Sequence, residues 1–307
     1  MSVVDFDAIV VGGGPAGLTA ARDLAKAGRS VLVLDKESLG GRPVNIEWIE
    51  DYPKPGEKIA GPKLAAQLVG EAETAGAQTA LAEVVEIESY SSCLAVSCDD
   101  GNAFTASVVI VAAGLRDKAL GVASEERLAG KGVIHCAFCD AGLYAGRDVA
   151  VAGGGDAGLI EAMLLADRGA KVRVVEARAE LSARPELQER AREVPNLEIL
   201  CGKRVVDIAG EEGVNGLVVE DAASGVSETL ETYGVLLHVG VEPATDCVEA
   251  LLDTDDDGFA ETSADLASEV SGLILAGDVR RNSPRTVTAA VEDGVRAAAT
   301  ALAFLAS

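Results

Sequence analysis

The sequence is poor in basic, aromatic and histidine residues. It has 26 Lys and Arg against 50 Asp and Glu, a formal net charge of −24, 3% aromatic residues and two histidines. Because binding to nucleic acid or to an anionic membrane requires basic patches, this charge balance argues against both kinds of partner. With only His135 and His238 available, a four-ligand zinc site is also hard to assemble.

Long apolar runs are missing as well. No stretch of eighteen apolar residues occurs, and the N-terminus leads directly into an apolar strand without a basic leader. We therefore expect a cytoplasmic protein with no membrane-spanning segment. The acidity fits both an ordinary soluble bacterial protein and a protein from a high-salt cytoplasm.

Two glycine-rich fingerprints dominate what is present. Gly12-Gly13-Gly14-Pro15-Ala16-Gly17 follows an apolar strand expected at 6–11, and Gly153-Gly154-Gly155-Asp156-Ala157-Gly158 follows one expected at 148–152. A helix is expected after each fingerprint. Glycines at this spacing let the backbone approach a pyrophosphate at a helix N-terminus, so each copy predicts a dinucleotide site.

An acidic residue ends the second strand of each unit. Asp35 and Glu176 stand about twenty positions after their fingerprints, where a carboxylate can accept a hydrogen bond from a ribose 2′-hydroxyl. The 307 residues allow about two domains. The fold class is therefore α/β with two Rossmann-like domains, and residues 82–99 and 103–112 are expected to form antiparallel strands between them.

A single Cys-x-x-Cys lies between the fingerprints, as Cys136-Ala137-Phe138-Cys139-Asp140. This spacing indicates a redox pair, with a zinc half-site and two unrelated thiols as the alternatives. If the motif opens a short helix, the helix dipole favours a thiolate. Asp140 is the candidate proton donor or acceptor, or else a capping or solvated carboxylate. Two nucleotide sites and one dithiol indicate an electron relay from a nicotinamide through a flavin to a disulfide.

These motifs resemble the low-molecular-weight thioredoxin reductase family nearly end to end. Cys136–Asp140 resembles its Cys-Ala-Thr-Cys-Asp, Gly40-Gly41-Arg42 its Gly-Gly-Gln, and Glu50-Asp51-Tyr52-Pro53 its Glu-Asn-Tyr-Pro. Ala276-Gly277-Asp278-Val279 matches its Ala-Gly-Asp-Val, and Arg285-Thr286-Val287 resembles its Arg-Gln-Val. The resemblance implies an FAD domain at 1–116 and 241–307, interrupted by a nicotinamide domain at 117–240 that contains the dithiol.

The resemblance also implies roles for individual residues. Cys139 would face the flavin, Cys136 would attack the partner disulfide and Asp140 would donate the proton, in a homodimer that reduces a thioredoxin-like protein. The implied FAD-binding residues are Gly12, Gly14, Pro15, Ala16, Gly17, Asp35, Lys36, Gly41, Arg42, Asp51, Gly114, Gly277, Asp278, Arg285, Thr286 and Val287. The implied nicotinamide-binding residues are Gly153, Gly155, Asp156, Ala157, Gly158, Glu176 and Arg178.

The chain departs from the family in the segment that binds the 2′-phosphate of NADPH. Family members that use NADPH carry His-Arg-Arg after the second-domain strand, whereas this chain has Glu176-Ala177-Arg178. A carboxylate beside a 2′-phosphate costs roughly 1–4 kcal/mol at surface-like screening. We therefore expect NADH as the cofactor in preference to NADPH, or else weak use of both. Arg42, Asp51 and Thr286 also replace Gln, Asn and Gln, either retuning the flavin or changing only the packing.

Other functions fit the same motifs. The relay could serve a small-molecule dithiol or disulfide, or could take electrons from a donor such as ferredoxin. A sensor that binds both nucleotides without turnover is disfavoured, because it would not need the dithiol.

The acidic surface predicts a salt dependence. Thioredoxins are often acidic, so two acidic partners repel each other in dilute buffer, and salt screens that repulsion. Turnover with a thioredoxin substrate should rise between dilute buffer and molar salt, while reduction of uncharged hydroxyethyl disulfide, the control, should change less. A fall with thioredoxin alone would contradict the expectation.

Overall fold

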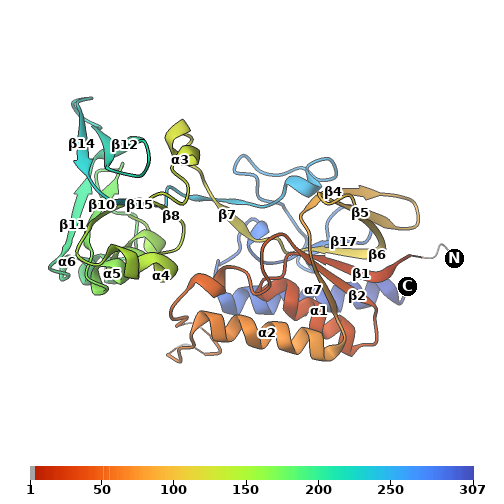
Figure 1. The fold of residues 1–307 in the computed structure, drawn as a ribbon. Coiled ribbons are helices and arrows are strands. Elements are labelled where there is room, and N and C mark those ends of the chain that lie inside the picture. Colours follow the sequence, from red (N-terminus) through yellow and green to blue (C-terminus); the bar gives the residue numbers. More distant parts are fainter. Residues whose placement is uncertain (1–3, 51, 55) are drawn as a thin grey trace. The chain divides into compact units, whose positions relative to one another are not determined.

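The computed structural model describes residues 4–50, 52–54 and 56–307, which form two compact units. The first unit comprises residues 1–116 and 242–307, and the second comprises residues 117–241. The second unit is therefore an insertion in the chain of the first (Figure 1). The return to the first unit comes one residue later than the 240/241 boundary expected from the sequence.

A mostly parallel sheet forms the centre of the first unit, with the strand order β3-β2-β1-β6-β5-β4 and with β17 also paired to β6. β1 pairs in parallel with β2 and β6, so that Ala8 lies opposite Val31 and Val108. β4, β5 and β6 pair antiparallel. The strands are β1 (Phe6–Val11), β2 (Val31–Asp35), β3 (Gln78–Leu81), β4 (Val84–Ser89), β5 (Leu94–Cys98), β6 (Ala103–Val111) and β17 (Leu273–Leu275).

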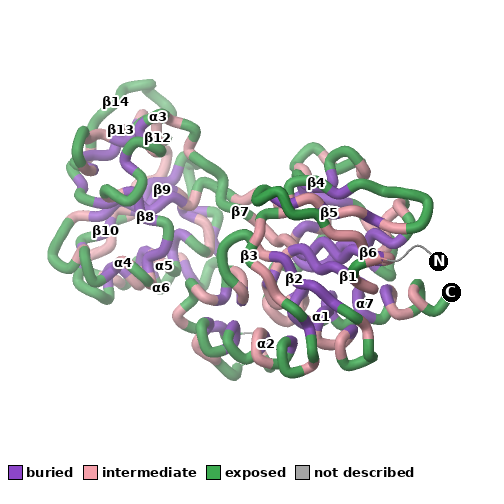
Figure 2. Tube along the Cα trace, turned by 45° about the vertical axis from the view of Figure 1, so that its right-hand side comes forward, coloured by how far each residue is buried: buried purple, intermediate pink, exposed green. Residues whose placement is uncertain are grey.

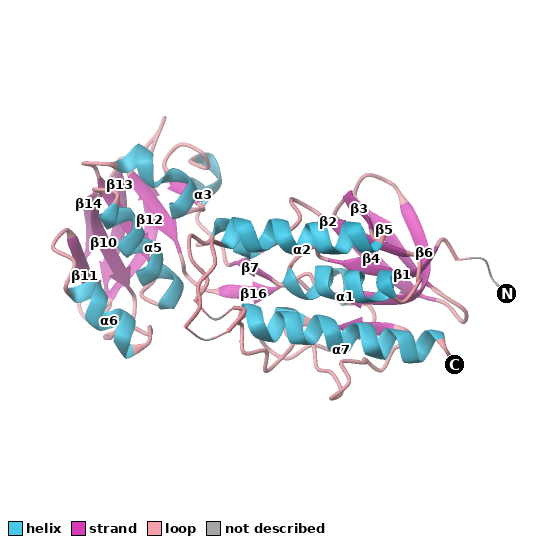
Figure 3. Cartoon of the chain, turned by 90° about the horizontal axis from the view of Figure 1, so that it is seen from below, coloured by secondary structure: helices cyan, strands magenta, loops and turns pink. Residues whose placement is uncertain are grey.

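Both faces of this sheet are covered, which explains why the four buried residues of β1, Ala8 to Val11, are all apolar. Ala8 and Val10 belong to one buried cluster together with side chains of three helices, and Ile9 and Val11 belong to a second cluster with side chains of β4 and β5. The buried strands appear in purple in Figure 2, and the three helices lie side by side in Figure 3. These helices are α1 (Pro15–Lys26), α2 (Gly61–Ala75) and α7 (Val287–Leu305).

The second unit repeats this plan on a smaller scale. Its parallel sheet has the order β11-β10-β9-β15-β8, and a separate antiparallel sheet has the order β12-β13-β14. Together with the sheet of the first unit, it confirms the α/β fold with two Rossmann-like domains. The strands are β8 (Val133–Ile134), β9 (Asp148–Ala152), β10 (Lys171–Glu176), β11 (Leu197–Cys201), β12 (Lys203–Ala209), β13 (Gly216–Asp221), β14 (Ser227–Glu231) and β15 (Gly234–Leu237).

Short helices complete both units, and the chain crosses between the units on two paired strands. The crossing strands are β7 (Leu115–Asp117) and β16 (Val241–Pro243). The remaining α-helices are α3 (Ala123–Arg127), α4 (Ala137–Asp140), α5 (Asp156–Asp167) and α6 (Pro185–Arg192). The 3-10 turns are η1 (Arg42–Asn45), η2 (Ala141–Tyr144), η3 (Asp246–Val248) and η4 (Gly277–Val279).

The stretch 82–99 differs from the sequence-based expectation. It was expected as one strand, but it forms the hairpin β4–β5, closed by a hydrogen bond from the Tyr90 amide to the Cys93 carbonyl at 2.9 Å. The turn is built from serines rather than from the Gly or Pro that usually mark a hairpin. The expected antiparallel pairing across the turn at 100–102 is present between β5 and β6.

None of the helices in the described part of the chain has both the length and the apolar character that crossing a bilayer requires. The four remaining cysteines are not equally buried. Cys98 and Cys247 are buried, and burial raises the pKa of the Cys247 thiol to about 12. Cys93 and Cys201 are only half-buried.

A buried ion pair joins α7 to the turn that follows β17. Asp293 is 4% exposed, and its Oδ2 accepts hydrogen bonds from the Gly277 amide and the Arg280 Nε, both at 2.9 Å. The Arg280 side chain is itself only 13% exposed. The pair therefore fixes the backbone at Gly277 and Asp278, two of the expected site residues.

Removing this carboxylate should destabilise the first unit. Asp293→Ala leaves the Arg280 guanidinium buried without its partner, which typically costs about 3–5 kcal/mol. The matched control is Asp246→Ala, which removes an exposed partner of Arg116 and should cost at most about 1 kcal/mol. Urea unfolding of both variants measures the difference, and equal losses would contradict the assignment.

Candidate functional site

The first fingerprint contains glycines of two kinds. Gly12 has φ +102°, and a Cβ added at Gly17 would lie 2.0 Å from the Gly12 carbonyl oxygen, so the fold itself requires both glycines. Gly14 has an ordinary φ of −83°, and a Cβ there would meet only the Gly41 Cα, at 3.9 Å. The fold therefore does not require glycine at 14. Glycine at this position leaves the backbone accessible to a ligand.

The second fingerprint shows the same division. A Cβ at Gly153 would lie 2.0 Å from the His238 carbonyl oxygen, and one at Gly158 would lie 2.1 Å from the Gly153 carbonyl oxygen. Gly155 has φ −83° and its nearest neighbour for an added Cβ is the Ser182 Oγ at 3.7 Å. Neither Gly14 nor Gly155 caps its helix with a side chain, so backbone amides at the start of α1 and α5 remain for a pyrophosphate.

The two acidic residues hold the fingerprint turns. Asp35 Oδ2 accepts from the Gly13 amide at 2.8 Å, and Glu176 Oε2 accepts from the Gly154 amide at 2.8 Å. Glu176 is 8% exposed, and its Oε1 also accepts from the Arg178 amide at 2.9 Å. Each oxygen has a second lone pair, with which it can accept from a ribose hydroxyl.

The expected flavin-side residues converge on the first fingerprint. A Cβ added at Gly41 would lie 2.8 Å from the Gly14 Cα, and one at Gly277 would lie 3.1 Å from the Ala16 Cβ. Asp278 Oδ1 accepts from the Ser283 hydroxyl at 2.7 Å. Four segments distant in the sequence thus meet at the start of α1, namely those containing Gly14, Gly41, Ala112 and Gly277.

Other expected residues lie around this point in different settings. Gly114 has φ +71° with open space around it, and the Lys36 Nζ lies 3.9 Å from Glu37. Arg42 begins η1, and Pro15 is the first residue of α1. The guanidinium of Arg285 lies 4.9 Å above the Phe259 ring, at a residue with φ +57°. Asp51 lies outside the described residues.

The departure at position 286 has a structural role. The Thr286 hydroxyl caps α7 by accepting from the Ala289 amide at 3.2 Å, and Val287 is the first residue of the helix. Thr is a preferred N-cap residue, whereas Gln is not among the preferred ones. The substitution thus changes local helix capping, whatever it does to a flavin.

The second nucleotide turn has few free positive charges. Arg178 is exposed, but the Arg184 Nε is paired with the Asp156 carboxylate at 2.6 Å. The pKa of the nearby Cys201 thiol is raised by its burial and then by the Glu176 charge.

The dithiol motif opens a short helix, α4, which the sequence raised only as a condition. Cys136 is the N-cap residue and forms a disulfide with Cys139. The Cys139 amide donates to the Cys136 Sγ at 3.1 Å. Cys136 is 9% exposed, whereas Cys139 is exposed. Asp140 is the last residue of the helix and is half-buried. The pKa of Tyr144 is raised, mainly by the burial of Tyr144 itself and next by the charge of Asp140.

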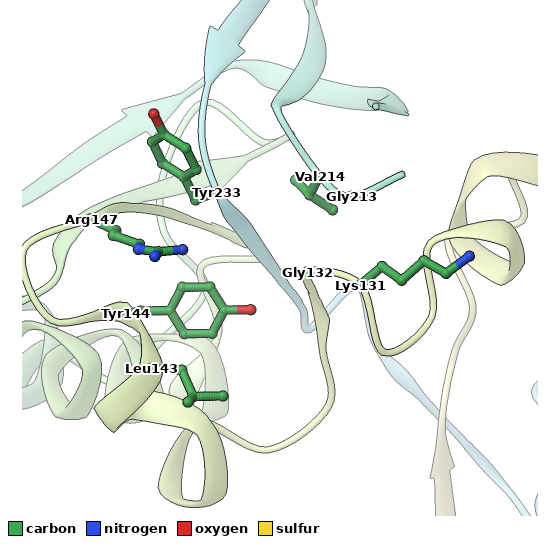
Figure 4. Close-up of a pocket in the computed structure, with 8 residues that line it drawn as sticks. All are labelled: Lys131, Gly132, Leu143, Tyr144, Arg147, Gly213, Val214 and Tyr233. Atoms are coloured by element: carbon green, nitrogen blue, oxygen red, sulfur yellow. The ribbon is translucent and has the colours of Figure 1, made fainter. Parts of the chain in front are cut away.

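Sequence reasoning missed a cavity of about 310 Å³ in the second unit (Figure 4). Arg147 lies between the rings of Tyr144 and Tyr233, 5.7 Å from the centre of the Tyr233 ring. The cavity lies where β9 and β15 begin, whereas the glycine turn follows the end of β9. It is therefore separate from the nucleotide turn. Within the described residues, no three His, Cys, Asp or Glu side chains gather as a metal site.

Comparisons with known proteins cover nearly the whole chain and therefore all of these features. Residues 6–294 match the family model described as pyridine nucleotide-disulphide oxidoreductase. The chain is 34% identical to the thioredoxin reductase of Bacillus subtilis over 294 residues, which are 95% of this chain and 92% of that protein. It is 32% identical to the enzyme of Listeria monocytogenes, over 94% of this chain and 90% of that one.

Solved structures agree with the sequence comparisons. The crystal structure of the Lactococcus lactis thioredoxin reductase matches with a TM-score of 0.92 at 29% identity, over 98% of this chain and 99% of that one. That of T. acidophilum matches with a TM-score of 0.90 at 28% identity, over 98% and 99% of the two chains.

The two open glycines generate a test. Gly14→Ala and Gly155→Ala should each retain the fold and weaken a different dinucleotide by about tenfold or more, which is 1.4 kcal/mol or more. The control is Gly70→Ala, inside α2 with open space around it. Bound flavin and nicotinamide affinity can be measured separately by fluorescence titration, and full binding in both variants would show that neither turn approaches a ligand.

Proposed function

The chain belongs to the pyridine nucleotide-disulphide oxidoreductases, within them to the low-molecular-weight thioredoxin reductase family, and from this premise we propose the course of its electrons. They pass from a nicotinamide dinucleotide, which is NADH in preference to NADPH, through FAD to the Cys136–Cys139 disulfide. From there they reach a thioredoxin-like protein. The observation that carries the proposal is a disulfide at the start of α4, in the unit that also holds the second glycine turn.

FAD fits the first unit, because Gly14 is open to a pyrophosphate and Gly41 and Gly277 approach the same helix start. When bound, FAD supplies a carrier that accepts a hydride and passes on two electrons. The residues of this chain bind and orient it: the α1 amides at the pyrophosphate, Asp35 at a ribose, and Asp278 beside the Gly277 turn. The nicotinamide dinucleotide is assigned by the same reasoning to the start of α5.

The cysteines supply the exchange chemistry. Two electrons and two protons convert the Cys136–Cys139 disulfide into two thiols. The Cys136 thiolate then attacks a sulfur of the partner disulfide to form a mixed disulfide, which Cys139 resolves to release the reduced partner. The Cys139 amide at the Cys136 Sγ stabilises the charged form of that thiol. Asp140, adjacent to Cys139 and half-buried, is assigned the proton transfer.

The preference for NADH is argued from charge. Glu176 is buried and bonded to the Gly154 and Arg178 amides, so its carboxylate cannot turn away from an incoming 2′-phosphate. The guanidinium of Arg184 is paired with the Asp156 carboxylate, which reduces its availability to a 2′-phosphate.

The partner and the assembly follow the relatives. Proteins named thioredoxin reductase match nearly the whole chain, which supports a thioredoxin-like substrate. A homodimer in the cytoplasm is the assembly and location that we propose from the family resemblance. A small-molecule disulfide or a ferredoxin donor would use the same dithiol, and turnover assays with each substrate distinguish these alternatives.

Anaerobic titration tests the donor. NADH should bleach the flavin absorbance at lower concentration than NADPH, and kcat/KM should favour NADH. Ala177→Arg adds a cation at an exposed position beside Glu176 and should raise kcat/KM for NADPH about tenfold, which corresponds to 1.4 kcal/mol.

Ala145→Arg is the charge-matched control, since Ala145 lies just before β9 begins rather than where β9 ends. Comparable kcat/KM for NADH and NADPH in the unmodified protein would contradict the proposed preference for NADH. If neither NADH nor NADPH bleaches the flavin while dithionite reduces it normally, the electron donor is a ferredoxin or a thiol.

A further inference from the structure

A carboxylate and an imidazole lie directly behind the dithiol turn. Glu161, on α5, accepts a hydrogen bond through its Oε2 from the Ala137 amide at 3.0 Å. Ala137 is fully buried and is the residue that follows Cys136. The His238 Nε2 lies 3.4 Å from the same Glu161 oxygen. Three elements therefore meet at one carboxylate: α4, α5 and the segment after β15.

His238 is held there with its ring nitrogen otherwise unsatisfied. Its side chain is 9% exposed, and its Nε2 makes no hydrogen bond of good geometry among the described residues. Its own amide donates to the Ala152 carbonyl at 2.7 Å, and its carbonyl oxygen crowds Gly153. The backbone of His238 thus packs on the second glycine turn while its ring points toward the carboxylate under the dithiol.

We propose that Glu161 and His238 act as a positioning pair that sets the reactivity of Cys136. The inference rests on the dithiol role proposed above. Glu161 fixes the first amide of α4, and its negative charge opposes formation of a thiolate on the neighbouring residue. The His238 Nε2, 3.4 Å from the same carboxylate oxygen, partly offsets that charge from the other side, as an N–H dipole when the ring is neutral and as a cation when it is protonated. Thiolate is the reactive form, so the balance between the two side chains governs how fast the reduced dithiol attacks a disulfide.

Other titratable groups occupy the adjoining segments. Within the described residues, none of them forms a hydrogen bond or an ion pair with Glu161 or His238. They are His135 and Asp140 beside the dithiol, Tyr144 on η2, Asp156 in the first turn of α5 and Glu176 at the end of β10. The charge nearest the Ala137 amide is therefore that of Glu161.

Alkylation of the reduced protein tests the pair. The FAD-loaded full chain is reduced with dithiothreitol, desalted without oxygen and treated with iodoacetamide between pH 5.5 and 10. Mass spectrometry of the Cys136 peptide then gives the pH midpoint of its reaction. Glu161→Gln keeps an oxygen acceptor for the Ala137 amide but removes the charge, so the midpoint should fall by about one pH unit.

His238→Gln leaves the carboxylate without its offset, so the midpoint should rise by about half a pH unit. In the double variant the change at His238 should have no further effect, because its target charge is gone. Glu189→Gln, an exposed carboxylate on α6, is the matched control and should leave the midpoint unchanged.

Unchanged midpoints in folded Glu161→Gln and His238→Gln would overturn the proposal and leave a purely structural contact. So would an equal effect of His238→Gln in the presence and absence of Glu161. If Glu161→Gln fails to fold, His238→Gln decides alone. The measurement needs neither a nicotinamide nor a partner protein, so failure of the proposed donor or substrate does not affect it.

Discussion

Close approach of backbone to backbone at two glycine turns is the constraint on which both units depend. The Gly12 carbonyl oxygen lies 2.0 Å from where a Cβ of Gly17 would be, and the Gly153 carbonyl oxygen lies 2.1 Å from where a Cβ of Gly158 would be. This contact brings the first turn of a helix against the end of a parallel strand. The first amides of the helix have no side-chain cap, and a pyrophosphate is a ligand that helix N-termini of this kind commonly bind.

The same turn is stabilised in the same way in both units but in different electrostatic settings. Asp35 and Glu176 each accept from the middle amide of the glycine run. In the first unit, a buried Arg280–Asp293 pair then supports the neighbouring Gly277 turn. In the second, the available arginine at 184 is already paired with Asp156. The same turn geometry thus occurs in two different charge settings.

The sequence predicted what is encoded locally. Each fingerprint is contiguous, and the position of its acidic partner follows from strand and helix length, so the two Rossmann-like units could be predicted without a structure. Contacts between distant residues could not. Nothing local shows that Gly277 lies against Ala16, or that Glu161 accepts from Ala137. For Thr286 the sequence left a retuned flavin and a change of packing both open, and only the structure reveals that this residue caps α7.

The dithiol occupies a place where opposing electrostatic effects meet. The Cys139 amide donates to the Cys136 sulfur and favours its thiolate. The buried Ala137 amide donates instead to the Glu161 carboxylate, whose negative charge disfavours that thiolate. A protein with 50 acidic and 26 basic residues offers few cations to tip this balance. One of its two histidines is nevertheless buried beside that carboxylate. Burying an imidazole without a good hydrogen bond is unfavourable for folding, so its place is best explained by its effect on the carboxylate beneath the active-site turn.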